Sequence, residues 1–464
     1  MNETRPDGGW TSPGPMSGTD TLFWRLSGNP LTRPHVTWLW LLESPPEWGD
    51  FVRACDGATR RLPRLRHRVA ETPLRTGTPS WTPDTGFRLS RHVHRMRLPA
   101  PGGLRELLDL VEWRASAAFD PLHPPWEITL VEGYERDRAA AVLTWHHSVG
   151  DAVTIVAAVR RLMTGGAPTE TAGPAAAPPR DPSAPHSGPG RRAAVSRLVG
   201  DAAEEARTAL RAGVRALTAP GATGAGARIA GGAVAQLLQP MSSSPLLARR
   251  SPALHYGLLT VSLPGLKAAG KAAGVSVTSA YVSAILGAFH RYHDHHGFVR
   301  DTVPVLVPVS LREPHETGAG NLVAAVVIPG PVGDLPARAR MVRVHDAVAE
   351  ARSLVARGAC TVLAGLGALV PRPLYERLAP LLLRRIDVVV TSVPGLPATA
   401  RAAGSPVVNA VPWAPRGGAA ANISMASHGD LCGIGTNLDP AAITDPGLFH
   451  RCLEDSFEET LGHG

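Results

Sequence analysis

The sequence of 464 residues has few cysteines, almost no lysine and no long apolar run. Its four cysteines, Cys55, Cys360, Cys432 and Cys452, form no Cys-x-x-Cys pair, which argues against a zinc ribbon and against a disulfide scaffold. No run of about 18 apolar residues is present, so we expect no transmembrane helix. The first residues lack the basic start and apolar core of a signal peptide. We therefore expect a cytoplasmic protein with at most peripheral membrane contact.

Lysine occurs at Lys267 and Lys271, so nearly all of the 47 basic residues are arginines, and the formal net charge is +8. The codon usage of a GC-rich genome explains this bias, because Ala, Gly and Pro are abundant too. Attraction to an anionic partner explains it equally, whether a phosphorylated cofactor, an acidic carrier protein or an anionic lipid surface. No nucleic-acid-binding motif accompanies the charge, and we expect no nucleic-acid partner.

Hydrophobic periodicity predicts an α/β (α+β) chain in two lobes of similar size. Residues 1–164 and 255–464 alternate strands with helices, whereas 165–254 form a Pro/Ala/Gly-rich crossover linker with one or two helices. The strands are expected at 35–43, 126–134, 138–147, 255–263, 302–311, 322–329 and 387–395. The helices are expected at 103–119, with Leu104, Leu107, Leu108 and Val111 on one face, and at 151–163, 276–293 and 337–357.

Two adjacent histidines end one of these strands, in the stretch AVLTWHHSVGDAVTIV (141–156). The period of two in a strand predicts that His146 and His147 point to opposite faces, which makes joint metal ligation awkward. One histidine could act as a proton acceptor at the corner between strand and helix, and both could equally be core residues. Asp151 starts the next helix, either as an N-cap or as the partner of an arginine.

This stretch, His146-His147-Ser148-Val149-Gly150-Asp151-Ala152, resembles the HHxxxDG motif of CoA-dependent acyltransferases and peptide-synthetase condensation domains. Further segments in the same order are similar to the wax ester synthase/diacylglycerol acyltransferase family within that superfamily. They are PMSGTDTLFWR (15–25), WTPDTGFRLSRHVHRMRLPAPGG (81–103), FDPLHPPWEITLVEG (119–133), VPVSLRE (307–313), GNLVAAVVIP (320–329) and DVVVTSVPGLP (387–397). The resemblance spans nearly the whole chain except 165–250.

The resemblance implies two similar lobes with a channel between them, and acyl transfer from a thioester such as acyl-CoA to an alcohol. In this scheme His147 is the general base, no acyl-enzyme forms, and His146 is structural. Asp151 orients the loop through Arg312. The other residues it assigns are substrate-binding (Gly150, Ala152, Ser392, Pro394, Gly395) or structural (Trp126). No GxSxG elbow occurs, which argues against a serine hydrolase. No cofactor is implied, because the acyl thioester is a substrate.

The chain departs from the family pattern at three places. Ala152 replaces the motif glycine, Thr278-Ser279 stand for Asn-Asp, and Thr391-Ser392 stand for Ser-Asn. Two alternatives therefore stay open. One is an O- or N-acyltransferase of specialised metabolism that takes its acyl group from an acyl carrier protein. The other is a catalytically silent homologue that acts as a binding partner. In the leading hypothesis, contact with a membrane or lipid droplet is peripheral.

A second group of histidines lies at the end of the helix predicted at 276–293. It comprises His290, His293, His295 and His296. The group could ligate a metal ion, but cationic side chains at a helix C-terminus are ordinary. We expect no metal.

Overall fold

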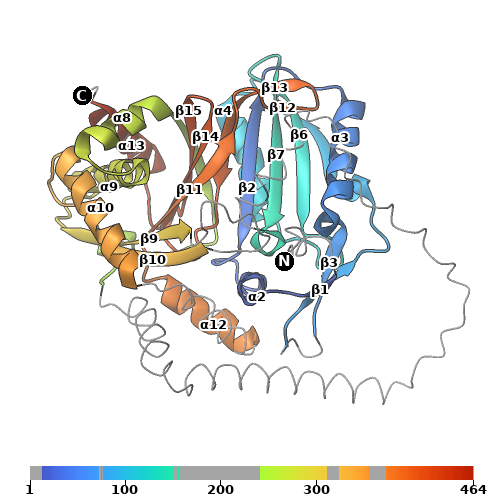
Figure 1. Cartoon of the computed structure of the whole chain (residues 1–464), viewed down its shortest axis with the longest axis horizontal. Helices are drawn as coiled ribbons and strands as arrows, with labels where there is room; N and C mark the ends of the chain where they lie inside the picture. The colour runs from blue at the N-terminus through green and yellow to red at the C-terminus, as the bar shows by residue number, and fades with distance from the viewer. Residues whose placement is uncertain are drawn as a thin grey trace, which may run out of the picture.

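The computed structural model describes residues 13–72, 75, 77–150, 155, 241–310, 323–354 and 372–462. Within these ranges the chain forms two six-stranded sheets and one small sheet. Each large sheet carries its own helices, and the two resulting lobes stand side by side in Figure 1. In the described ranges no single helix is long and apolar enough to cross a membrane, although the bent pair Leu263–Ala273 and Val277–His295 passes by length and composition together.

The first lobe is built on a sheet in the order β12-β13-β2-β7-β6-β5. Its strands are β2 (His35–Leu42), β5 (Val93–Arg97), β6 (Trp126–Tyr134), β7 (Arg138–His146), β12 (Arg401–Ala402) and β13 (Ser405–Trp413). Alternation along β2 separates two faces, because Trp38 and Trp40 join one core cluster whereas Leu39 joins another. Helix α3 (Trp48–Arg61) covers the tryptophan face and α4 (Leu104–Ser116) covers the leucine face.

Short elements complete this lobe at one end of its sheet. Helix α2 (Gly18–Leu26) begins at the N-cap Ser17, whose side chain accepts a hydrogen bond from the Asp20 backbone. A small sheet combines β1 (Gly14–Pro15), β4 (Ser80–Pro83) and β3 (His67–Ala70). The single-turn 3-10 helices here are η1 (Pro63–Arg66), η3 (Leu89–Arg91) and η4 (His147–Val149). Helix α2 packs against η4, and this contact positions the histidine pair.

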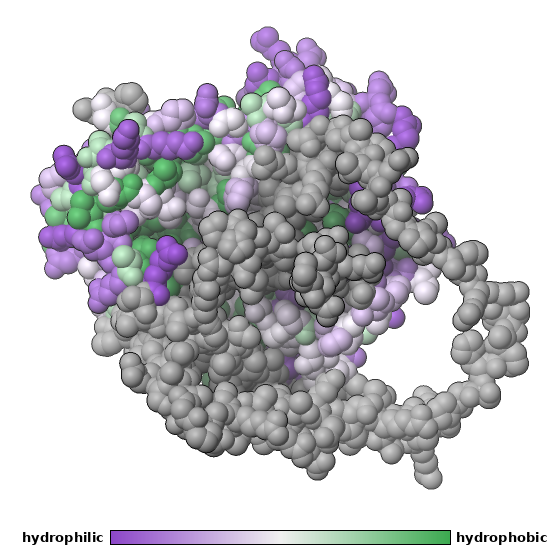
Figure 2. All heavy atoms as spheres, viewed as in Figure 1, coloured by the Kyte–Doolittle hydropathy of each residue, from purple (hydrophilic) through white to green (hydrophobic). Residues whose placement is uncertain are grey.

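The second lobe has the strand order β10-β9-β11-β14-β15-β8. Its strands are β8 (His255–Ser262), β9 (Thr302–Ser310), β10 (Val323–Pro331), β11 (Val388–Leu396), β14 (Ala421–His428) and β15 (Leu431–Leu438). Its helices are α8 (Leu263–Ala273), α9 (Val277–His295), α10 (Ala337–Leu354), α12 (Arg372–Leu383) and α13 (Pro446–Leu461), with η5 (Pro245–Leu247) before β8. Every residue of α9 from Ser279 to Phe289 is buried, so this helix lies at the centre of the lobe. Figure 2 shows hydrophobic side chains between hydrophilic ones over this lobe.

The two lobes share the C-terminal half of the chain. Strands β12 and β13 leave the second lobe and add to the first sheet, where β13 pairs with β2. Sheet membership therefore does not follow the predicted division at 254/255, because Arg401–Ala402 and Ser405–Trp413 belong to the first lobe. Strand β13 then lies against β14 and β15 of the second lobe. The transfer of β12 and β13 to the first sheet joins the lobes along a seam between β13 and the strands β14 and β15.

The predicted strands and helices in the described ranges all form, with ends within a few residues of those expected. Of the four residues expected on one face of α4, Leu107, Leu108 and Val111 are buried, whereas Leu104, the first residue of the helix, is 37% exposed. The predicted helix at 151–163, apart from Ile155, and the linker up to residue 240 lie outside the described residues.

Candidate active site

Strand β7 delivers the histidine pair to the end of the first sheet. His146 is its last residue and pairs with His35 of β2. The backbone N–H of His147 donates to the Pro34 carbonyl at 2.8 Å, and the chain then turns into η4. The alternation of a strand therefore stops at His146. Both imidazoles contact α2, His147 at Phe23 and His146 at Trp24.

His146 is buried and its two ring nitrogens have different partners. The Ser148 backbone N–H donates to Nδ1 at 3.1 Å, so Nδ1 carries a lone pair and Nε2 carries the proton. Nε2 lies 2.7 Å from the Ser27 hydroxyl oxygen, and that hydroxyl donates to the Trp24 carbonyl at 2.6 Å. This chain of donors and acceptors fixes one neutral tautomer of His146. The ring has no lone pair available to accept a proton from a substrate.

The surroundings of His146 keep it neutral. Burial lowers its pKa well below the usual value, and His35, His147 and Arg372 lower it further through charge repulsion. Burial also lowers the pKa of His35 to about 3. His35 lies with its ring 6.0 Å from that of His146 and hydrogen-bonds the Ala115 carbonyl through Nδ1 at 3.2 Å. His35 and His146 are therefore two neighbouring histidines that are both buried and both neutral.

His147 is only half-buried, whereas His146 and Ser148 on either side of it are buried. Its ring stacks on Phe23 of α2, with centroids 4.0 Å apart and an interplanar angle of 16°. The adjacent residue Trp24 packs against His146 at 5.0 Å. One turn of α2 therefore orients both imidazoles, and His147 is the more exposed of the two.

An apolar pocket lies between α3 and the tryptophan face of the first sheet. Its cavity volume is about 110 Å³. Trp145 and Ile155, which flank the HHxxxD stretch, line it together with Trp40, Trp126 and Ala58. The Trp145 indole also donates to the Gly150 carbonyl at 3.2 Å. The motif and the pocket wall are therefore parts of one local structure.

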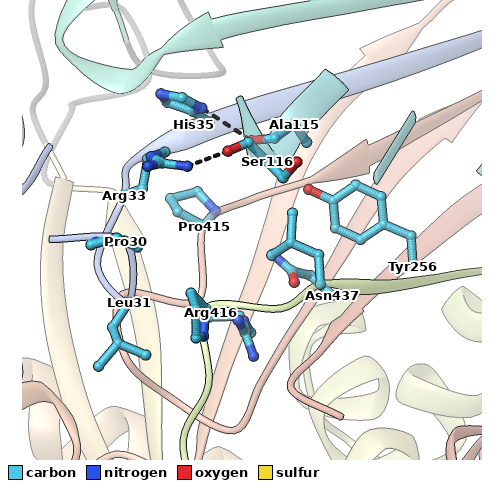
Figure 3. Close-up of a pocket in the computed structure, with 12 residues that line it drawn as sticks. Pro30, Leu31, Arg33, His35, Ala115, Ser116, Tyr256, Pro415, Arg416 and Asn437 are labelled. Carbon is cyan, nitrogen blue, oxygen red and sulfur yellow. Dashed lines mark hydrogen bonds between the residues drawn. The ribbon is translucent and has the colours of Figure 1, made fainter. Parts of the chain in front are cut away.

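A second, polar pocket lies between the lobes and holds about 30 Å³, enough for about two water molecules. Figure 3 shows Arg33 and His35 of the first lobe on one side of it and Arg416 and Asn437 on the other. Arg416 is buried and pairs with Asp439 at 3.0 Å. Since His35 contacts His146, this pocket adjoins the histidine pair from the side of the interlobe seam.

The remaining predicted site residues fall into three groups. Gly150 follows η4, and Trp126 is buried, donates to the Leu65 carbonyl at 2.8 Å and stacks on His92. Ser392, Pro394 and Gly395 lie on β11, whose last residue Leu396 packs in the same core cluster as Trp145 and Ile155. No hydrogen bond or ring contact joins these three to the histidine pair in the described part of the chain. Asp151, Ala152 and Arg312 lie outside the described residues.

Several residues of the site were missed by the predictions. Phe23, Trp24 and Ser27 lie more than a hundred positions before the histidines, and His35 comes from another strand. The stretch LFWRLS (22–27) gives one weak signal, because it places two aromatic residues and a capping serine at a helix end. Their contacts with the histidines depend on tertiary packing, so periodicity alone does not indicate them.

The second histidine group does not form a metal site among the described residues, where no three His, Cys, Asp or Glu side chains could hold an ion together. His293 hydrogen-bonds the Phe289 carbonyl at 2.7 Å and the Ser244 hydroxyl at 2.8 Å. His290 hydrogen-bonds the Val332 carbonyl at 3.0 Å. These bonds tie the end of α9 to neighbouring segments.

The chain crosses from the second sheet to the first in β12 and β13, and a histidine pair stands at the end of β7. This arrangement places the chain in the class of two-lobed acyltransferase and condensation-domain folds. The structure of the wax ester synthase/diacylglycerol acyltransferase from Marinobacter aquaeolei VT8 matches with a TM-score of 0.61 and 20% identity, over 96% of this chain and 98% of that one. The first condensation domain of the calcium-dependent antibiotic synthetase matches with a TM-score of 0.59 and 15% identity, over 97% of each chain.

Two family models cover most of the sequence. The wax ester synthase/diacylglycerol acyltransferase catalytic domain matches residues 16–281, and the WS/DGAT C-terminal domain matches residues 319–460. A Mycobacterium tuberculosis protein is 31% identical over 96% of this chain and 91% of its own length. That protein is named as a provisional diacylglycerol O-acyltransferase. The chain belongs to the wax ester synthase/diacylglycerol acyltransferase family, as its motifs predict. The names of its relatives support an O-acyltransferase.

Proposed function

We propose that the protein transfers an acyl group from an acyl thioester, such as acyl-CoA, to the hydroxyl group of an alcohol, with His147 as general base. The observation that carries this proposal is the difference between the two histidines. His146 is locked in one neutral tautomer by Ser148 and Ser27, whereas His147 is half-buried and oriented by Phe23. Only one imidazole of the pair is thus in a position to meet a substrate.

The chemistry follows from that placement. The His147 imidazole accepts the proton of the alcohol as its oxygen attacks the thioester carbonyl, and a tetrahedral intermediate forms. Its collapse breaks the carbon–sulfur bond and expels the thiolate, which takes the proton back from the imidazolium. General-base assistance of this kind contributes about 10²–10⁴ in rate. No acyl-enzyme is needed, because the alcohol attacks the thioester directly.

The apolar pocket beside the motif supports an acyl substrate. Among the described residues its lining is almost entirely hydrocarbon, and Arg401 is the one charged residue there. Apolar cavities of about 150 Å³ hold molecules as large as benzene, so a cavity of about 110 Å³ receives part of an aliphatic chain. We assign this pocket to the hydrocarbon chain of the acyl group, with the thioester carbonyl outside the pocket and facing His147.

The test is acyl transfer by His147→Ala and His146→Ala with a panel of acyl-CoA donors and alcohols. We expect His147→Ala to lose about 10²–10⁴ in kcat with little change in melting temperature. His146→Ala is expected to lower the melting temperature, because it leaves Ser27 and the Ser148 N–H without their buried partner. Turnover by His147→Ala close to that of the wild type would contradict the assignment.

The same panel separates the alternatives. Transfer from a carrier-protein thioester but not from acyl-CoA, or to an amine rather than an alcohol, indicates an acyltransferase of specialised metabolism. Absence of transfer from every donor by the wild-type protein indicates the silent homologue.

A further inference from the structure

Helix α12 turns its apolar side to solvent. Leu374, Leu378 and Leu381 recur at intervals of four and three residues, the spacing that places side chains on one face of a helix. They are 48%, 45% and 61% exposed. A helix on the surface of a globular protein normally buries such a face against the core. A contiguous set of exposed leucines is instead typical of a surface that binds something.

The opposite side of α12 fixes this orientation through polar contacts. Arg372 pairs with Glu71 of the first lobe and with Glu376 one turn along, and its side chain is 11% exposed. Ala379 is buried on the same side, and burial raises the pKa of Tyr375 to about 12. Turning the leucines inward would expose Tyr375 and break the ion pair between Arg372 and Glu71. The outward apolar face is therefore held in place by the fold.

Exposed arginines accompany the leucines. Arg377 lies on α12 beside the leucine face, and Arg384 and Arg385 follow the end of the helix. A helix that combines leucines with surrounding basic residues is the kind that lies in the interface of a lipid layer. Basic side chains at that depth meet the phosphates of anionic lipids, and the formal net charge of +8 adds long-range attraction.

The position of α12 connects this face to the histidine pair. Helix α12 packs against α2, which carries Phe23 and contacts η4. At the end of α2 a Cβ on Gly28 would lie 2.0 Å from the Glu376 carboxylate, so the two helices approach closely there. In Figure 1, α12 lies near α2 at the lower margin of the described part of the chain. A lipid surface bound by α12 would thus lie near His147.

We propose that α12 is the element by which this protein adsorbs to anionic lipid surfaces. Leu374, Leu378 and Leu381 enter the layer between the acyl chains, and Arg377, Arg384 and Arg385 bind the phosphates. Adsorption itself is independent of the proposed function. A second consequence rests on that function: an alcohol dissolved in the lipid reaches His147 without crossing water.

Vesicle sedimentation with the full-length protein tests adsorption. The wild type is expected to bind vesicles of phosphatidylglycerol and phosphatidylcholine, to bind pure phosphatidylcholine more weakly, and to lose affinity as salt is added. The triple variant Leu374→Ser, Leu378→Ser, Leu381→Ser is expected to bind at least about tenfold more weakly. The matched control replaces three other exposed leucines, Leu104, Leu122 and Leu431, with serine and is expected to bind as the wild type does.

Melting temperatures show whether each variant is folded, and exposed leucines should leave them nearly unchanged. Equal vesicle binding by the α12 variant and the wild type overturns the proposal, and so does an equal loss in the control variant. A wild-type protein that ignores vesicles but dimerises through α12, as measured by analytical ultracentrifugation, overturns it in favour of a protein partner.

An activity measurement then tests the consequence for catalysis. The α12 variant should keep transfer to a short, water-soluble alcohol while losing transfer to a long-chain alcohol embedded in vesicles. If the wild type binds vesicles through α12 but transfers no acyl group at all, the proposed function fails and adsorption stands. If transfer to the embedded alcohol persists in the variant, the delivery role of α12 fails although the enzyme is active.

Discussion

At the scale of single residues, His146 uses both of its ring nitrogens in hydrogen bonds inside the protein. His146 uses Nδ1 as an acceptor and Nε2 as a donor inside the protein. Ser148 supplies both its backbone N–H and its hydroxyl to Nδ1, whereas within the described ranges Ser27 is the one partner of Nε2. The two serines therefore make unequal contributions, and this inequality can be measured.

Ser27→Ala leaves the Nε2–H of His146 without an acceptor in a buried site. An unsatisfied buried donor costs about 1–3 kcal/mol, so we expect the free energy of unfolding to fall by that amount. Ser148→Ala keeps the backbone N–H on Nδ1 and should cost less. Urea unfolding of both variants checks this order. A larger loss in Ser148→Ala would mean that His146 holds the opposite tautomer.

The apolar pocket makes a second prediction at this scale. Ala58→Leu places three further carbon atoms in the cavity lined by Trp145 and Ile155. Each methylene of the substrate that no longer fits weakens transition-state binding by about 1–3 kcal/mol. We therefore expect kcat/KM for long acyl donors to fall by about tenfold or more relative to short ones. Gly57→Ala on the same helix is the control, because its Cβ would meet no atom within 4 Å. If Ala58→Leu has the same preference for chain length as the wild type, the acyl group binds outside this pocket.

At the scale of elements, periodicity identified strands whose faces differ and helices with one apolar side. β2 and β6 alternate between two cores, and this pattern is visible in the letters of the sequence. Helix α12 was not predicted, because its leucines face solvent and its buried side carries Arg372 and Glu376. The departure of β13 into the first sheet was not predicted either, since pairing between Val411 and Leu39 joins residues far apart in the chain.

The seam made by β13 depends on two glycines of β15. A Cβ on Gly433 would lie 2.2 Å from the Ala410 carbonyl oxygen, and one on Gly435 would lie 2.1 Å from that of Pro412. These contacts leave no room for a side chain at either glycine, because neither carbonyl of β13 can move without disturbing the first sheet. The Trp413 indole crosses the same seam and donates to the Gly257 carbonyl at 3.1 Å.

We expect Gly435→Ala to separate the lobes locally and to lower the free energy of unfolding by about 1–3 kcal/mol, as overpacking does. Thermal unfolding measures the loss, and limited proteolysis should show faster cleavage. Gly57→Ala, which replaces an uncrowded glycine inside a helix, should instead stabilise by about 0.5–1 kcal/mol. Equal melting temperatures for Gly435→Ala and the wild type would show that the seam yields easily.

At the scale of the whole molecule, the order of short motifs predicted the family and the two-lobed fold. The roles of individual site residues stay predictions, because they depend on contacts between distant segments and on substrates. The contacts between Asp387 and the segment before β8 illustrate this limit. Asp387 is fully buried and binds Ser243, the Ser244 backbone N–H at 2.7 Å and Arg250 at 3.4 Å. The sequence shows an aspartate before a strand and nothing of these partners.

The fold also buries many neutral histidines, and this has a consequence for its stability. Burial lowers the pKa of His35 to about 3 and that of His450 to about 4, and it lowers the pKa of His146 well below its usual value. His67, His92 and His293 shift in the same direction for the same reason. All of these groups have a pKa of about 6.5 in an unfolded chain.

We therefore predict that the protein loses stability in mild acid, well before its carboxylates are protonated. As the pH falls below about 6.5, the unfolded chain takes up protons that the folded protein excludes, so each such histidine lowers the free energy of unfolding by up to about 1.4 kcal/mol per pH unit. The loss continues down to the folded pKa values, about 4 for His450 and about 3 for His35. Asp387 and Glu127, whose pKa values burial raises, act in the opposite direction as the pH approaches those values. Urea midpoints at pH 7.5 and 5.5 measure the effect, and His450→Gln should reduce the difference by removing one of the groups. Equal midpoints at the two pH values would show that these histidines are protonated inside the folded protein.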